Sequence, residues 1–422
     1  NGLRVLGVKD VELPMVRFSL VIKGGLLLDD IDKVGVANLV SSLMLKGTAN
    51  KTTAELEEAI KDLGATIRVR AHREDITISG NTLARNYDKT MALVQDILLN
   101  PRWDESEFEL AKQSVLSNIA QRAANPNSIA DRLYNGLVYG QKHILSRDLR
   151  GTKDSVNAIT LNNLKHFYQR NFVPSVSNFH IVGAVGQDKV LKSLTSLAAL
   201  WQDKKVTFTD YPLPTPFSKA QVYFYDIPDA KQSLLRFGYL AMNATDSDYY
   251  PATVMNYILG GGSFASQLTQ QLREGKGYTY GIRSRFAGSI NPGPFTISSS
   301  VRSNVTYESA ALVNKILADY PNVYDEDDHS VTQNFLLKSN ARAFETLGSK
   351  LNLLENISAY NRPTDYVVQQ EKLVRKMTIK DVSALASKYL DASKMVFLVV
   401  GDAKTQLDRL EDLGFGKPIL LK

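Results

Sequence analysis

The sequence of 422 residues contains no cysteine. This absence excludes disulfide bonds, thiolate zinc sites and cysteine nucleophiles together. Long apolar runs are also missing, because the best of them, such as Met395 to Val400, have the length of a strand. A membrane-spanning helix needs about 20 consecutive apolar residues. We therefore expect no membrane span in this chain.

Runs of charge of one sign are scarce as well. The chain has 50 basic and 44 acidic residues, a formal charge of +6, and the basic residues are scattered among the acidic ones. This pattern is typical of a solvated mixed-charge surface and argues against a nucleic-acid partner. Apolar residues make up 44% of the chain, which is enough for large cores in two or more domains.

Histidine is rare, and its spacing does not suit a metal. No two histidines stand four residues apart, the spacing that would direct both rings at one ion from a helix. We expect His180 to lie in a strand and His166 on a polar helix face. The acidic run from Asp325 to Asp328 could attract a cation, but its position between helical stretches favours a solvated loop. The five histidines are His72, His143, His166, His180 and His329.

An internal repeat sets the architecture. A helix is predicted to begin after Thr160 and again after Thr378, and in both places a strand ends at a glycine, Gly183 or Gly401, 23 residues later. The offset between the two copies is 218. Near the start of each half it is 219, where the segment 16–18 matches the segment 235–237. The two halves are therefore expected to be homologous.

The repeat predicts an α+β fold of two homologous α/β sandwich domains, each a mainly antiparallel sheet packed against helices. Each half reads as two strands, two helices, two strands, a mainly helical stretch, and a closing helix and strand. Thr52 and Glu55 form a predicted capping box for one of these helices. We expect domains at 1–210 and 218–422, joined by an extended proline-rich linker at 211–217.

A glycine run, Gly260, Gly261, Gly262 and Ser263, precedes a helix predicted at about 264–274. Backbone amides at such a helix start can bind an anion. No Gly-Lys-Ser/Thr follows at the spacing of a P-loop, so nucleotide binding is not expected. The structural alternative, which we favour, is a tight turn that passes close to another backbone. Contact with a ligand is a secondary expectation.

Arg273 and Tyr280 flank the turn that follows. The helix is expected to end at Gly275 and a strand to start around Tyr278. A guanidinium group and a phenol hydroxyl side by side can hold a carbonyl or a developing oxyanion. Taken by themselves, however, arginine is favoured at a helix C-terminus and tyrosine is common in strands. On the residues alone, the structural interpretation is the stronger one.

These features resemble the pitrilysin and insulinase peptidases, a zinc metallopeptidase family that includes mitochondrial processing peptidase and the core subunits of the respiratory bc1 complex. The resemblance covers nearly the whole chain. Four separated motifs carry it in order, namely the opening segment 1–5, the segment 35–48, the repeated strands ending at Gly183 and Gly401, and the segment 272–280.

Active members of this family carry a His-x-x-Glu-His motif just before the Lys-Gly-Thr of the second segment, and a distal glutamate roughly eighty residues later. The matching positions here hold Asn38, Ser41 and Ser42, and Asn118 on the distal helix. Amide and hydroxyl groups bind zinc weakly and supply no general base. The resemblance therefore implies a degenerate zinc site, no bound metal and no peptidase activity in this chain alone.

Arg273 and Tyr280 are similar to the pair that reaches into the catalytic chamber in this family. The resemblance implies half of a clam-shell chamber, formed with a zinc-bearing His-x-x-Glu-His partner as a heterodimer or as the other half of a fused protein. The chain would be the non-catalytic subunit, as in the smaller two-chain bacterial members, binding peptide substrates beside the partner's zinc, and a periplasmic location is expected. The alternative is a structural scaffold with no proteolytic role.

Overall fold

A computed structural model describes residues 1–421 of the chain in two compact units. Unit 1 consists of Asn1–Arg122, Arg147–Tyr211 and Arg342–Arg362, and unit 2 of Ala123–Ser146, Pro212–Ala341 and Pro363–Lys422. Each half of the sequence therefore contributes one segment to the unit formed mainly by the other half. Within the described residues, no helix is long and apolar enough to cross a membrane.

Unit 1 contains a five-stranded sheet of order β1-β5-β2-β4-β3, in which only the β1 and β5 pair is parallel. Its strands are β1 (Arg4–Lys9), β2 (Met15–Lys23), β3 (Thr66–Ala71), β4 (Asp75–Leu83) and β5 (Ser177–Gly183). Its helices are α1 (Val36–Leu43), α2 (Thr53–Asp62), α3 (Tyr87–Leu99), α4 (Glu105–Ala123), α6 (Lys153–Asn157), α7 (Leu161–Asn171), α8 (Gln187–Leu200) and α12 (Leu347–Ala359).

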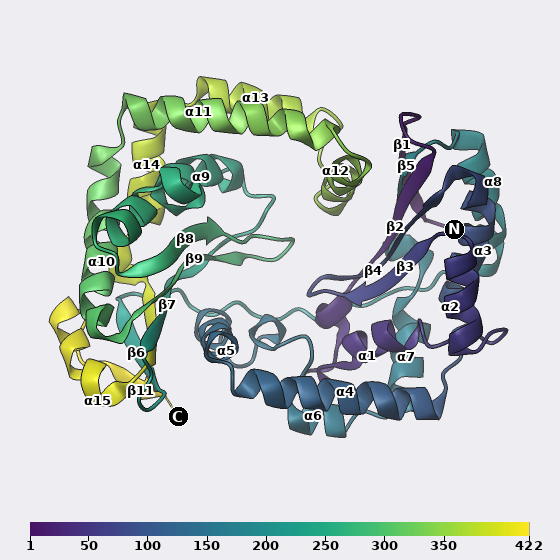
Figure 1. Ribbon diagram of the computed structural model, residues 1–422, viewed down its shortest axis with the longest axis horizontal. Coiled ribbons are helices and arrows are strands. Elements are labelled where there is room, and N and C mark those ends of the chain that lie inside the picture. Colours follow the sequence, from purple (N-terminus) through teal and green to yellow (C-terminus); the bar gives the residue numbers. More distant parts are fainter. Residues whose placement is uncertain (422) are drawn as a thin grey trace. The chain divides into compact units, whose positions relative to one another are not determined.

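The two faces of this sheet are covered differently. Val16, Phe18, Leu20 and Ile22 alternate along β2 and pack into the main core with the helices of the N-terminal half. The other face of β2 and β5 is covered by α12, which arrives from the C-terminal half of the sequence (Figure 1). Because both of its faces are covered, all seven residues of β5 are buried.

Unit 2 repeats this plan with a six-stranded sheet of order β11-β6-β10-β7-β9-β8. Its strands are β6 (Gln221–Asp226), β7 (Gln232–Met242), β8 (Thr279–Phe286), β9 (Gly293–Arg302), β10 (Val396–Gly401) and β11 (Ile419–Leu421). Its helices are α5 (Pro126–Tyr139), α9 (Tyr249–Asn256), α10 (Thr306–Val323), α11 (Glu326–Ala341), α13 (Tyr366–Lys376), α14 (Ile379–Tyr389) and α15 (Ala403–Gln406).

Helix α5, from the N-terminal half of the sequence, lies against β7 and β10 of unit 2. The hydroxyl of Tyr134 on this helix donates a hydrogen bond of 2.9 Å to the carbonyl oxygen of Phe295. Arg236 on β7 donates to Asp131 at 2.9 Å and to Asn127 at 3.1 Å. A tyrosine anchor and an ion pair therefore fix this helix on the sheet.

The predicted α+β class with two duplicated sheet-and-helix units is confirmed. Thr52, Thr160 and Thr378 each cap a helix with a reciprocal capping box. The prediction of a loop at 325–328 is wrong, because Glu326 begins α11. Acidic residues stabilise the first turn of a helix, and the carboxylate of Asp325 accepts the backbone N–H of Asp328 at 3.0 Å.

Candidate functional site

The positions that correspond to zinc ligands lie on α1 and α4 of unit 1. Asn38 is half-buried, Ser41 is buried, and Ser42 and Asn118 are exposed. The hydroxyl of Ser41 donates to the carbonyl of Ala37 at 2.9 Å, and that of Ser42 to the carbonyl of Asn38 at 3.0 Å. Both hydroxyls are therefore used within the helix.

These residues do not fit a catalytic zinc ion. Such a site needs about three imidazole or carboxylate ligands around one open position. Asn38, Ser41, Ser42 and Asn118 provide neutral amides and hydroxyls instead. Among residues 1–421, no group of three or more histidine, aspartate or glutamate side chains is arranged to hold a metal. The other candidate residues, Arg273 and Tyr280, lie in unit 2.

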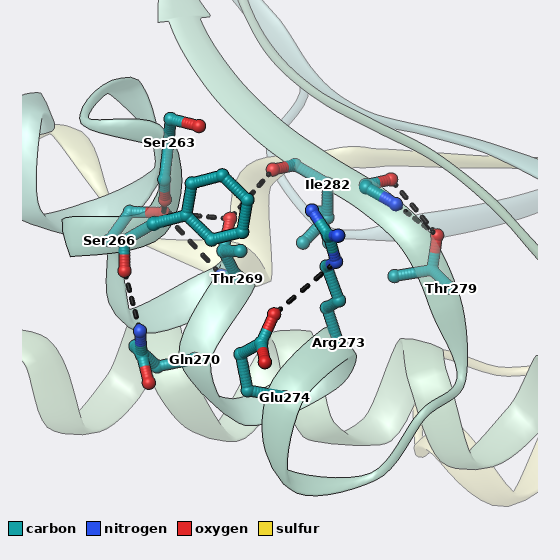
Figure 2. Close-up of polar contacts among 10 residues, drawn as sticks. Ser263, Ser266, Thr269, Gln270, Arg273, Glu274, Thr279 and Ile282 are labelled. Carbon is teal, nitrogen blue, oxygen red and sulfur yellow. Dashed lines mark hydrogen bonds and ion pairs between the residues drawn. The ribbon is translucent and has the colours of Figure 1, made fainter.

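Arg273 lies on a π-helical segment, η8 (Thr269–Gly275), that leads into β8. The Nε of Arg273 lies 3.3 Å from Oε1 of Glu274, an ion pair drawn as a dashed line in Figure 2. Its guanidinium group lies 4.7 Å from the ring centre of Phe264. The helix predicted at 264–274 begins instead with a 3-10 turn at Ser263–Ala265 and ends as predicted at Gly275. π-Helical turns are often found at functional sites.

Tyr280 lies in a bulge of β8. Thr279 pairs with Val301 and Ile282 with Ser299, so β8 has one extra residue between these two pairs. The hydroxyl of Thr279 accepts the backbone N–H of Gly281 at 3.0 Å, and the hydroxyl of Ser299 donates to Thr279 at 3.0 Å (Figure 2 shows the Thr279 contact). The bulge leaves Tyr280 90% exposed. Bulges redirect side chains in this way beside active sites.

The outer edge of β8 is covered from Ile282 to Ser284. The hydroxyl of Thr269 donates to the carbonyl of Ile282 at 3.3 Å, and the amide of Asn256 donates to the carbonyl of Ser284 at 2.9 Å. At Gly260, in the π-helical turn η6 (Tyr257–Gly261), an added Cβ would lie 2.6 Å from the backbone nitrogen of Ser284. Gly260 thus lets the turn pass close to the backbone of β8, as the prediction of a tight turn beside another backbone requires.

A cavity of about 480 Å³ opens in unit 2 beside these elements. Three arginines on three different elements, Arg236, Arg273 and Arg283, line it, and no acidic residue among the described residues does. The glycine run contributes Gly260, Gly261 and Ser263. The remaining lining residues are Asn127, Thr269, Gly281, Ile282, Ser298 and Ser299. The predicted residue Arg273 belongs to this cavity, whereas Tyr280 and Gly262 are not among its lining residues.

Sequence reasoning missed Arg283, and it used Arg236 only as a marker of the repeat. A signal for Arg283 exists in the sequence, because Ile67-Arg68-Val69-Arg70 and Ile282-Arg283-Ser284-Arg285 share the pattern Ile-Arg-x-Arg at an offset of 215. Both segments are edge strands in which buried residues alternate with exposed arginines. The partners across each strand, however, depend on the register, which the pattern does not contain.

Two family models match consecutive parts of the chain. The model described as insulinase (peptidase family M16) matches residues 4–152, and the one described as peptidase M16 inactive domain matches residues 158–322. A non-peptidase homologue, YmxG of Helicobacter pylori, is 23% identical over 93% of this chain and 90% of its own length. A probable mitochondrial-processing peptidase subunit beta of Arabidopsis thaliana is 22% identical over 64% of this chain and 53% of its own length.

Solved structures agree with these matches. A structure described as the peptidase M16 inactive domain from Pseudomonas fluorescens superposes with a TM-score of 0.89 at 24% identity, covering 96% of this chain and 97% of that chain. A protease from Helicobacter pylori superposes with a TM-score of 0.83 at 17% identity, covering 95% and 97%. These likenesses establish the shared fold. With both family models matched in order along one duplicated fold, the chain belongs to peptidase family M16, the insulinase family.

Proposed function

We propose that this chain is the non-catalytic subunit of a zinc-dependent peptidase and that it supplies Arg273 and Tyr280 to substrate bound at the zinc of a partner. The partner would be an M16 chain with an intact His-x-x-Glu-His motif, separate or fused. Zinc would then belong to the partner, because Asn38, Ser41, Ser42 and Asn118 do not fit a zinc site.

The exposure of Tyr280 carries this proposal. A tyrosine side chain that is 90% exposed gains little from folding, yet a bulge held by Thr279 and Ser299 directs it outward. Its hydroxyl has no hydrogen-bond partner among residues 1–421. Arg273 precedes it on the other side of the turn, and among the described residues only its Nε faces an acidic partner, Glu274. Two donors held on either side of one turn suit a peptide carbonyl or its oxyanion.

Extended peptides are the substrate class that we propose. A peptide can add to a sheet where an edge strand is free. The edge of β8 is covered by Thr269 and Asn256, whereas β3 is the terminal strand of the unit 1 sheet and none of its carbonyls accepts a side-chain hydrogen bond among the described residues. Strand addition is therefore supported at β3 rather than at β8.

The alternative is a scaffold of the same fold without a proteolytic role. One observation favours it: the guanidinium group of Arg273 is already in contact with Glu274 and stacked on the ring of Phe264. Such contacts satisfy an arginine without any ligand. The two functions differ in what the removal of this side chain would do to a partner's activity.

The test is reconstitution of the chain with its zinc-bearing partner. Alone, the chain should bind no zinc and cleave no peptide. With the partner, peptide cleavage should appear, and Arg273→Ala and Tyr280→Phe should each lower kcat/KM by about a hundredfold to a thousandfold, the loss expected for one hydrogen-bond donor to a transition-state oxyanion.

Two matched variants serve as controls. Arg375→Ala removes an exposed arginine from α13, and Tyr278→Phe removes the hydroxyl of a neighbouring tyrosine, and neither should change cleavage. Full activity of both site variants would support the scaffold instead. The periplasmic location is part of the same proposal, rests on the resemblance, and is tested by fractionating cells of the native source.

A further inference from the structure

Arg236, Ser298 and Arg283 form a row across three neighbouring strands of unit 2. Ser298 on β9 pairs with Arg236 on β7 and, on its other side, with Arg283 on β8. Residues directly opposite one another in a sheet project from the same face. Helix α5 lies beside this row, since Asn127 accepts a hydrogen bond from Arg236. The row therefore forms a floor of the 480 Å³ cavity.

The three guanidinium groups of the cavity are not equally neutralised. Arg236 is 9% exposed and bound to Asp131, and Arg273 faces Glu274. The guanidinium group of Arg283 has no acidic partner and no hydrogen bond among the described residues, and the hydroxyl of Ser298 opposite it has no hydrogen bond either. The cavity therefore contains one uncompensated positive charge beside one free hydroxyl.

We propose that this cavity is an anion subsite that binds a carboxylate of a peptide, with Arg283 as the recognition residue and Ser298 as a second donor. The proposal rests on the proposed function, because it names a substrate class for the same unit. One uncompensated guanidinium matches the single charge of a carboxylate, which arginine binds with two parallel hydrogen bonds. Either an aspartate or glutamate side chain or a free C-terminus supplies this group.

The size of the cavity fits a peptide segment rather than an isolated ion. Ligand pockets span about 300 to 1,000 Å³, and 480 Å³ holds an acidic side chain together with its neighbouring backbone. Arg273, which also lines the cavity, is the residue proposed to hold a substrate carbonyl. The subsite and the Arg273 contact would therefore bind different groups of the same peptide.

Fluorescence anisotropy of the full chain with labelled peptides tests the subsite. Three amidated peptides of one extended sequence carry glutamate, glutamine or lysine at the central position, and a fourth carries glutamine with a free C-terminus. The glutamate peptide should bind about tenfold tighter than the glutamine peptide and tighter still than the lysine peptide. Preference for the fourth peptide over its amidated form would identify the C-terminus as the source of the carboxylate.

The variants Arg283→Gln and Arg375→Gln remove one exposed charge each from unit 2. Arg283→Gln should abolish the preference for the carboxylate and leave binding of the glutamine peptide unchanged, whereas Arg375→Gln should retain it. Because Arg283 is exposed and unpaired, its replacement should not alter thermal unfolding. Equal affinity for all four peptides, no binding of any of them, or a preference that survives Arg283→Gln would overturn the subsite.

The outcome is separable from that of the proposed function. Cleavage of the glutamine peptide by the complex with the partner tests Arg273 and Tyr280 without involving the carboxylate. If the chain binds all four peptides equally but Arg273→Ala still slows this cleavage, the subsite fails and the proposed function stands. If carboxylate preference is present but Arg273→Ala has no effect on cleavage, the proposed function fails instead.

Discussion

His180 shows how one buried side chain links α12 to the sheet of unit 1. It is fully buried on β5, with Nδ1 3.2 Å from the hydroxyl of Ser19 on β2 and Nε2 2.6 Å from the hydroxyl of Ser358 on α12. Burial, assisted by the charge of Arg4, lowers the pKa of this imidazole to about 4. The ring is therefore neutral in the folded protein at neutral pH.

This pKa predicts a dependence of stability on pH. In the unfolded chain the histidine pKa is about 6.5, so between pH 6.5 and 4 the unfolded state binds a proton that the folded state does not. The free energy of unfolding should therefore fall by on the order of 3 kcal/mol as the pH decreases through this window. In His180→Gln, which retains a donor near Ser358, urea unfolding between pH 4 and 7 should lack this part of the slope.

His166 is the matched control, because it is an exposed histidine on α7 of the same unit. His166→Gln should retain the slope of the unaltered chain. The same difference in unfolding free energy between pH 7 and pH 4 in His180→Gln and in the unaltered chain would show that His180 titrates normally. A uniform loss of stability at all pH values would reflect the lost hydrogen bond alone.

At the scale of elements, Gly238 determines how closely α5 approaches the sheet of unit 2. Its φ is +145°, and an added Cβ would lie 2.0 Å from the carbonyl oxygen of Phe295 and 2.6 Å from the hydroxyl of Tyr134. The hydrogen bond between these two groups anchors the helix. A side chain at this position would therefore separate α5 from β7 and β9.

Gly238→Ala should lower the free energy of unfolding by roughly 3 kcal/mol, because overpacking and a strained φ each cost about 1 to 3 kcal/mol. Gly281→Ala is the control in the same sheet, since nothing lies within 4 Å of its added Cβ and its φ is ordinary. It should change stability by less than about 1 kcal/mol. If both substitutions change the free energy of unfolding in urea by the same small amount, α5 can move away from the sheet without loss of stability.

The elements show which parts of the fold can be predicted from sequence. Local signals located the capped helices at Thr52, Thr160 and Thr378 and the strands that end at Gly183 and Gly401. The π-helical segments were not predicted, because a backbone hydrogen bond that spans five residues instead of four leaves no distinct pattern in the sequence. Arg283 was missed because its importance depends on the register of β7, β9 and β8, which forms only in the folded sheet.

At the scale of the whole molecule, the duplicated halves exchange equivalent helices. Helix α5 begins at residue 126 and α12 at residue 347, an offset of 221 that is close to the repeat offset of 218 to 219. Each belongs to the unit whose other elements come mainly from the opposite half. Periodicity could not reveal this exchange, because an amphipathic helix does not specify which sheet it covers.

The exchange predicts that a fragment ending before the proline-rich linker cannot fold by itself. Fragment 1–210 would lack α12 and would expose Val182, which packs in a small core with Leu347, Leu351 and Leu354. Losing two or more such leucine contacts costs more than about 5 kcal/mol, comparable to the whole stability of many domains. In urea, this fragment should therefore unfold without a cooperative transition.

Joining residues 342–362 to the fragment through a flexible linker should restore that transition, because it returns α12 to the sheet. The control is the same joined fragment with Leu351 and Leu354 changed to aspartate. It has the same length and the same added segment but lacks the apolar contact with Val182. Circular dichroism and near-ultraviolet spectra would monitor both. If fragment 1–210 alone unfolds cooperatively at the same urea midpoint as the joined form, α12 does not contribute to the stability of unit 1, and the N-terminal half folds without it.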